Sequence, residues 1–122
     1  MYSESAARAA LLAFGLALCA GGGPAAAEDW PTRPVTMLVP FAAGGGTDVM
    51  GRIIGRRLSE VLGQQVIIEN VGGAGGMVGS ARVAKAAPDG YQFVLGSRAD
   101  AINQSLYKKP LYNLVTDLVP AC

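Results

Sequence analysis

The sequence contains no histidine and only two cysteines, Cys19 and Cys122. Without histidine the chain lacks the Ser-His or Cys-His pair that nucleophilic catalysis commonly uses. Cys19 lies in a segment that we expect to be cleaved off, and the one remaining cysteine builds neither a zinc site nor an internal disulfide. These absences remove much of the usual enzymatic equipment and favour a function without catalysis.

Positive and negative side chains are also almost equal in number. Ten Lys and Arg residues oppose nine Asp and Glu residues, so the formal net charge is +1. A nearly neutral chain lacks the strongly basic surface that attracts nucleic acid or an anionic membrane. The longest apolar run, from Ala9 to Ala20, is too short to span a bilayer, which needs about 20 residues.

Residues 1–27 have the pattern of a secretory signal peptide. Arg8 supplies a positive flank, the run from Ala9 to Ala20 forms the hydrophobic region, and Ala25 to Ala27 offer small residues for cleavage. We expect cleavage after Ala27 and a soluble periplasmic product made of residues 28–122. A chain of this length has room for one small domain at most.

Short apolar runs alternate with amphipathic stretches in the rest of the chain. Val35 to Val39 is brief and rich in β-branched residues, which is typical of a strand covered on both faces. Apolar residues between Asp48 and Leu62 recur at helical spacing and form one stripe, and Gly51 and Gly55 favour close packing on a sheet. The pattern predicts strands at 35–39, 64–69 and 91–96, helices at 48–62 and 77–87, and a short helix at 101–107. The order β-α-β-α-β predicts an α/β fold with a parallel sheet and right-handed crossovers.

Two glycine-rich turns follow the first two predicted strands, at Phe41 to Asp48 and at Asn70 to Gly76. Such a turn at the start of a helix offers unpaired backbone N–H groups and the positive end of the helix dipole to an anion. Ligands of such sheets lie beyond the carboxyl ends of the strands, where Ser97 to Asn103 also falls. The residues therefore predict an anion site, with carboxylate and phosphate both open. The simpler alternative is that the glycines only form tight turns.

Thr47 and Asp48 stand at the expected start of the first helix. Thr47 suits the N-cap position and Asp48 suits the first turn. A carboxylate that pointed into the cleft would repel an anionic ligand. We therefore interpret Asp48 as a capping residue or as the partner of a cationic part of the ligand.

A rival interpretation is a Rossmann-type dinucleotide enzyme. Gly73 to Gly79 resembles the spaced glycine fingerprint, and Asp100 follows at roughly the distance expected of a ribose-binding acid. Against this, the glycines begin several residues after Ile68, so the strand does not turn tightly into the helix. A secreted chain would also rarely meet a nicotinamide cofactor. A third interpretation is a truncated remnant that binds nothing.

Most of the chain after the leader resembles one known family in a single register. The matching segments are Trp30 to Val35, Val39 to Asp48, Leu62 to Val66, Glu69 to Gly76, Val83 to Tyr91 and Ile102 to Tyr107. They resemble the opening of the extracytoplasmic solute receptors of tripartite tricarboxylate transporters, the Bug family. This match is much more specific than any single glycine motif.

The resemblance implies a two-lobed, type II periplasmic-binding fold that closes on a small carboxylate: a di- or tricarboxylate, an amino acid or an aromatic acid. It implies no catalysis, no cofactor and no metal, and it implies membrane permease subunits as partners. In the family, backbone groups and ordered water hold the ligand carboxylate. Carried onto this chain, the ligand-binding residues are Phe41, Ala43, Gly44, Gly45, Gly46, Thr47, Asp48, Gly73, Ala74, Gly75, Gly76, Ser97 and Asn103.

The chain departs from the family pattern at several positions. Family members usually carry Arg or Lys followed by Pro where Val71 and Gly72 stand, and Pro where Gln104 stands. Pro110 and Leu111 have the reverse of the common order. The family also runs to about twice this length or more. We therefore expect residues 28–122 to be a partial N-terminal lobe carrying half of a carboxylate site.

Overall fold

The computed structural model describes residues 29–121, so the predicted signal peptide lies outside the described residues. The elements in chain order are β1 (Val35–Val39), α2 (Gly46–Leu62), β2 (Val66–Asn70), the short 3₁₀ helix η1 (Ala74–Gly76), α3 (Met77–Ala84), β3 (Gln92–Val94) and α4 (Arg98–Leu106). This order confirms the predicted β-α-β-α-β fold, and α4 corresponds to the short helix predicted at 101–107. Within the described residues no helix is long and apolar enough to cross a bilayer.

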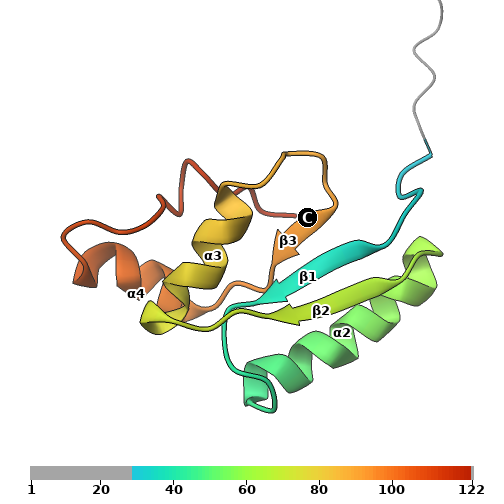
Figure 1. The fold of residues 1–122 in the computed structure, drawn as a ribbon, viewed down its shortest axis with the longest axis horizontal. Coiled ribbons are helices and arrows are strands. Elements are labelled where there is room, and N and C mark those ends of the chain that lie inside the picture. Colours follow the sequence, from blue (N-terminus) through green and yellow to red (C-terminus); the bar gives the residue numbers. More distant parts are fainter. Residues whose placement is uncertain (1–28, 122) are drawn as a thin grey trace, which may run out of the picture.

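The sheet has three parallel strands in the order β2-β1-β3, so β1 lies in the middle (Figure 1). Val35 pairs with Val66 and Val39 with Asn70, while Leu38 pairs with Val94 on the other side. Apart from its second residue, β1 is almost completely buried, and Pro40 after it is buried too. The strand that the sequence marks most clearly is thus the centre of the core.

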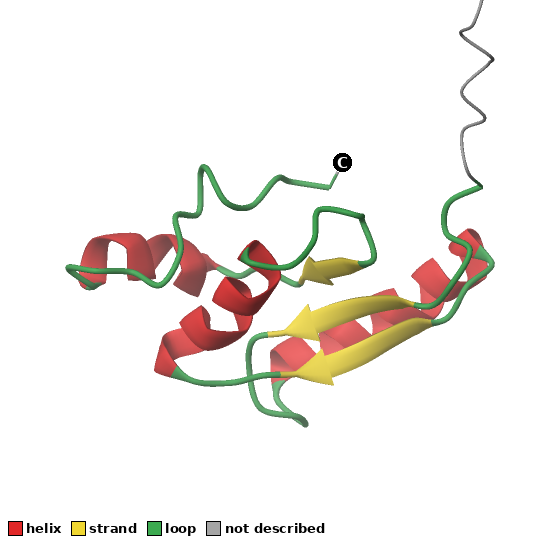
Figure 2. Ribbon diagram, turned by 45° about the horizontal axis from the view of Figure 1, so that its top comes forward, coloured by secondary structure: helices red, strands yellow, loops and turns green. Residues whose placement is uncertain are grey.

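The helices cover opposite faces of this sheet, because two crossovers of the same hand run in opposite directions along it: α2 connects β1 to β2, and α3 connects β2 back past β1 to β3. Successive side chains of a strand point to opposite faces. Gly51 of α2 lies against Val39 and Met37, whereas Gly79 of α3 lies against Leu38. Figure 2 shows α2 running alongside β1 and β2, with α3 and α4 gathered toward the other end of the molecule.

Glycines bring both helices close to the sheet. A Cβ added to Gly51 would lie 2.9 Å from Val39 Cγ2, and one added to Gly55 would lie 2.8 Å from Ile68 Cδ1. The predicted close packing of these two glycines is therefore confirmed. A Cβ on Gly79 would lie only 2.5 Å from the Val71 carbonyl oxygen, so α3 approaches even backbone atoms.

The glycine face of α2 explains why the predicted apolar stripe is only partly buried. Val49, Met50 and Ile53 are 51%, 53% and 63% exposed, because the helix turns Gly51 and Gly55 toward the sheet instead. The predicted N-cap was also wrong. The N-cap of α2 is Gly45, without a side-chain hydrogen bond, and the helix includes Thr47.

Other boundaries also differ from the prediction, and β2 begins at Val66 and ends at Asn70. α3 ends at Ala84, three residues early, and β3 is only three residues long. α4 begins at Arg98 because Ser97 and Asp100 form a reciprocal capping box that starts the helix there. A capping acid three residues after a serine is visible in the sequence, but it competes there with the glycine and strand signals around it.

The segment after α4, residues 107–121, packs back across α3 (Figure 1). Tyr112 is only 5% exposed and forms a small core with Met77 and Ala81. Leu114 and Leu118 pack partly against that core. This stretch has no clear hydrophobic period, and its place comes from these tertiary contacts.

Replacing Gly79 with Ala should destabilise the fold by about 1–3 kcal/mol, since the new methyl group overpacks against backbone of two neighbouring segments. Urea unfolding followed by circular dichroism would measure the loss. Gly46→Ala is the matched control, because a Cβ there meets nothing within 4 Å. It should leave stability equal or higher by up to about 1 kcal/mol. Equal stability of both variants would contradict the close packing of α3.

Candidate functional site

Three loops follow the carboxyl ends of the three parallel strands and meet at one edge of the sheet. The side chain of Asn70, at the end of β2, donates to the Phe41 carbonyl oxygen at 3.1 Å and to Asp48 Oδ1 at 3.0 Å. The Asn103 side chain of α4 donates to the Gly75 carbonyl oxygen at 3.0 Å. Hydrogen bonds thus join the first loop to the second and the second to the third, as the predicted crevice requires.

Asp48 is an internal partner of the first glycine turn. Its Oδ2 accepts hydrogen bonds from the Gly44 amide at 2.8 Å and from Arg52 Nε at 3.0 Å. Only 2% of the residue is exposed. The hydrogen bond from Arg52, followed by that from the Gly44 amide, lowers the pKa of Asp48 to about 2. With both carboxylate oxygens occupied, Asp48 shapes the turn and has no free oxygen for a cationic ligand group.

The start of α2 leaves backbone donors open. The amides of Gly45, Gly46, Thr47 and Asp48 donate no hydrogen bond within residues 29–121, and no side chain caps the helix. Such unpaired N–H groups, at the positive end of a 17-residue helix, favour an anion. Asp48 occupies the Gly44 amide only, so the turn is held without its donors being used up.

The second glycine turn has a similar opening. Gly73, Ala74, Gly75 and Gly76 all have positive φ, and Ala74, at 47°, is the one residue of the four with a side-chain cost. The amides of Ala74 and Gly75 donate no hydrogen bond within the described chain, whereas the Gly76 amide is bonded to the Gly73 carbonyl at 2.9 Å. An added Cβ on Gly76 would lie 3.3 Å from the Phe41 ring. The two turns are therefore in direct proximity.

The third loop is closed by its own side chains. The Ser97 amide donates to Asp100 Oδ2 at 2.7 Å, and Ser97 Oγ accepts from the Ala99 amide at 3.2 Å. Only the hydroxyl hydrogen of Ser97 is left for a ligand. At the start of α4 the Ala99 and Asp100 amides are bonded to Ser97, and the Arg98 amide alone donates no hydrogen bond in the described chain. This helix start is therefore largely satisfied, in contrast to the two glycine turns.

Asp100 is buried, with 4% of the residue exposed. It accepts hydrogen bonds from Ser80 Oγ at 2.6 Å and from the Tyr112 hydroxyl at 2.5 Å. Burial alone would raise the pKa of Asp100, but the hydrogen bonds from Ser80, Tyr112 and Ser97 outweigh burial and lower it. An acid enclosed in this way cannot bind a ribose, which removes the residue that the dinucleotide interpretation depends on.

The predicted site residues thus divide by what their polar groups can reach. Backbone donors are open at Gly45, Gly46, Thr47, Asp48, Ala74 and Gly75. The amides of Gly44, Gly76 and Ser97 and the side chains of Asp48 and Asn103 are engaged internally; Phe41 is half-buried; and Ala43 and Gly73 are exposed. Sequence reasoning missed the bridging roles of Asn70 and Arg52. An asparagine at the end of a strand, opposite a second loop, was the signal available for Asn70.

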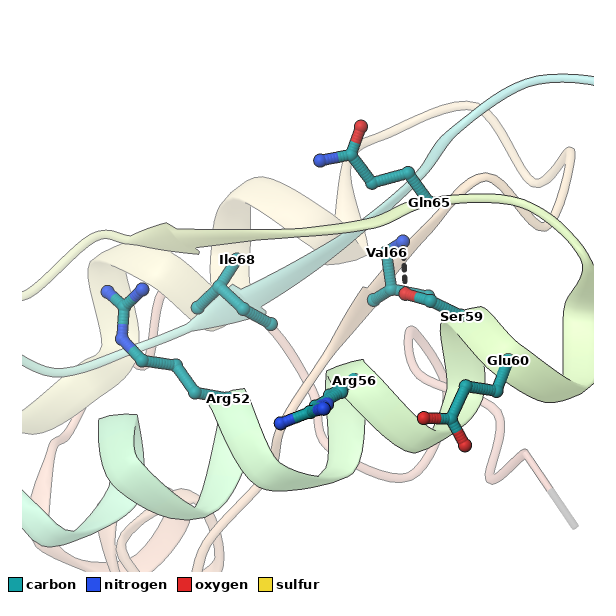
Figure 3. Close-up of a pocket in the computed structure, with 7 residues that line it drawn as sticks. All are labelled: Arg52, Arg56, Ser59, Glu60, Gln65, Val66 and Ile68. Carbon is teal, nitrogen blue, oxygen red and sulfur yellow. Dashed lines mark hydrogen bonds between the residues drawn. The ribbon is translucent and has the colours of Figure 1, made fainter.

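A shallow groove of about 520 Å³ lies elsewhere, between α2 and the open edge of β2 (Figure 3). Arg52 and Arg56 line it, and the Ser59 hydroxyl there accepts a hydrogen bond from the Val66 amide at 2.8 Å. It runs along the side of the sheet, and Arg52 connects it to the strand ends through its hydrogen bonds to Asp48 and Asn70. No cluster of acidic, cysteine or histidine residues suited to a metal occurs in the described chain.

Comparison with known proteins agrees with this architecture. Residues 50–122 match the tripartite tricarboxylate transporter family receptor. Protein BugT of Bordetella pertussis is 41% identical over 114 residues, which cover 90% of this chain and 35% of BugT. The chain therefore belongs to the receptor family of the tripartite tricarboxylate transporters, and it spans about a third of the length of this curated relative.

Solved structures show the same fold. The periplasmic binding protein BugD is 46% identical, with a TM-score of 0.70 over 72% of this chain and 29% of BugD. An adipate complex from R. palustris is 42% identical, with a TM-score of 0.68 over 71% of this chain and 29% of that one. MatC from Rhodopseudomonas palustris, with bound malate, is 43% identical, with a TM-score of 0.64 over 72% of this chain and 30% of MatC. The structure thus corresponds to a partial first lobe of a periplasmic-binding fold.

The lowered pKa of Asp48 predicts an acid-labile first turn. A carboxylate with a folded-state pKa of about 2 and an ordinary value of 3.8 stabilises the fold above about pH 4, and this contribution disappears as the pH falls toward 2. Asp48→Asn should be less stable than the parent at pH 6 and should lose part of the parent's decline between pH 4 and pH 2. Thermal melts across this range would show it.

Glu60→Gln serves as the control for this measurement, because Glu60 is a half-exposed carboxylate on the same helix. It should keep the steep acid dependence of the parent. An Asp48→Asn protein with the same acid slope as Glu60→Gln would contradict the assignment.

Proposed function

We propose that this chain forms the ligand-capturing first lobe of a periplasmic receptor for small dicarboxylates. The observation that carries the proposal is the pair of open helix starts, at Gly45 to Asp48 and at Ala74 to Gly75, on adjacent strand ends. Backbone N–H groups bind an anion without placing a cation in the site, which suits a chain of nearly neutral charge. Relatives whose structures hold adipate and malate support a dicarboxylate as the ligand.

The whole receptor would act by closing on its ligand. A two-lobed receptor buries a small molecule between its lobes through hinge closure, and permease subunits in the membrane then receive it. In this proposal the protein has no catalytic role and works in the periplasm, as the location of its binding-protein relatives suggests. The first lobe supplies the anion-binding backbone, and ligand choice depends also on groups from the second lobe.

Titration of the ¹⁵N-labelled chain with adipate tests this function. The amides of Gly45, Gly46, Ala74 and Gly75 should move in fast exchange, with a dissociation constant on the order of millimolar, since half of the enclosing contacts are missing. The uncharged diamide of adipic acid should move none of them. Shifts confined to other residues would overturn the proposed site, and micromolar binding would contradict the half-site.

A proline at position 46 tests whether an open amide binds the ligand. Gly46 is the first residue of α2, where proline is tolerated, and Gly45 before it has the extended conformation that proline requires, with φ −80° and ψ 168°. Gly46→Pro removes one N–H donor and should weaken adipate binding about tenfold, the typical scale for a hydrogen bond to a charged group.

Gly46→Ala keeps that amide and is the matched control for the proline variant. It should bind adipate as the parent does. Both variants should keep the parent's melting temperature within a few degrees, since a stability change of about 1 kcal/mol shifts the melting temperature of a domain of this size by roughly 4–8 °C. Equal adipate affinity of Gly46→Pro and Gly46→Ala would show that this amide does not contact the ligand.

A further inference from the structure

The inward face of α4 carries two buried polar side chains that reach in different directions. Asp100 and Asn103 are both 4% exposed and stand three residues apart, so they lie on one side of the helix. Asp100 contacts α3 and the segment 107–121, whereas Asn103 contacts the second glycine turn. One rigid helix therefore connects the packing of the C-terminal segment to a loop of the proposed site.

The Asp100 end of this connection is tightly determined. Its partner Ser80 is completely buried, and its partner Tyr112 is 5% exposed. In the described part of the chain, no buried polar side-chain atom lacks a hydrogen-bond partner. Loss of one partner would leave buried polar atoms unsatisfied, which forces the helix to adjust or to admit water. The hydrogen bond from Ser80 thus fixes α4 against α3, and the one from Tyr112 fixes it against the segment 107–121.

The Asn103 end acts directly on the turn. Besides its hydrogen bond to the Gly75 carbonyl, the amide packs against the residue itself, because a Cβ on Gly75 would lie 3.2 Å from Asn103 Oδ1. No other hydrogen bond reaches the Gly75 carbonyl within residues 29–121. Gly75 and Ala74 both have positive φ, so this turn is held in a conformation that few residues adopt.

We propose that Asp100 is a positioning residue for the second glycine turn. By fixing α4 against Ser80 and Tyr112, it holds the Asn103 amide in contact with Gly75. This contact orients the open amides of Ala74 and Gly75 toward the proposed site. The last step, ligand capture by those amides, rests on the proposed function. The positioning itself does not.

Tyr112→Phe in the 122-residue chain tests the positioning, because it keeps the buried ring and removes one hydrogen bond from Asp100. In ¹H–¹⁵N spectra without ligand, the amide signals of Ala74 and Gly75 should shift clearly. Tyr107→Phe is the matched control, since it removes the same hydroxyl from an exposed tyrosine on the same segment. It should leave both signals in place. Unmoved signals in Tyr112→Phe would overturn the proposal.

A second comparison tests whether Asn103 is the link. In the Asn103→Ala background, Tyr112→Phe should no longer shift Ala74 and Gly75, whereas its effect on the melting temperature should persist. Shifts that remain in that background would overturn the route through Asn103. Should Tyr112→Phe fail to fold, Ser80→Ala removes another hydrogen bond from the same carboxylate and is read by the same criteria.

Adipate titrations of the same variants separate this proposal from the proposed function. Tyr112→Phe should weaken adipate binding by roughly two- to thirtyfold, the range found for mutations that act on a site through intervening residues. If no variant responds to adipate, the dicarboxylate function fails, and the ligand-free shifts still decide the positioning. If adipate binds all variants equally while Ala74 and Gly75 shift, the turn is positioned by Asp100 but does not hold the ligand, which overturns the last step.

Discussion

The close approach of two helices to β1 is the constraint on which the rest of the structure depends. Gly51 and Gly55 bring α2 against one face of the sheet, and Gly79 brings α3 against the other. A side chain at any of these positions would push a helix away from the strand. The glycine turns that follow β1 and β2 lead directly into α2 and α3. They would then move apart, because their positions depend on those of the two helices.

Two buried aspartates organise the strand ends in different ways. Asp48 binds the Gly44 amide and the Asn70 side chain, and it leaves the following amides of α2 open. Asp100 binds the Ser97 amide within a capping box and closes the start of α4. The same residue type therefore keeps one helix start available to an anion and satisfies another internally.

Burial and the hydrogen bond to the Asp100 carboxylate also raise the pKa of Tyr112 to about 12, so its hydroxyl stays a donor.

The chain matches only part of the length of its relatives, and it leaves apolar side chains exposed on α2. The chain spans about a third of the relatives' length, and Val49, Met50 and Ile53 stay more than half exposed on α2. The anion site that we propose consists of backbone donors and requires no basic side chain at its centre. Such a site would suit different carboxylates, and structures of two relatives hold adipate and malate.

The sequence by itself determined the α/β order, the central strand and the two glycine turns, because these depend on local signals: β-branched runs, helical periodicity and turn residues. Gly51 and Gly55 could even be assigned to the packing face from their spacing. Only the tertiary structure decided how the turns are joined, since Asn70 and Asn103 bind the Phe41 and Gly75 carbonyl oxygens, 29 and 28 residues away along the chain. It also decided the burial of Tyr112, whose segment has no hydrophobic period. Such contacts depend on how the helices rotate against the sheet, and that rotation is set by packing between distant segments.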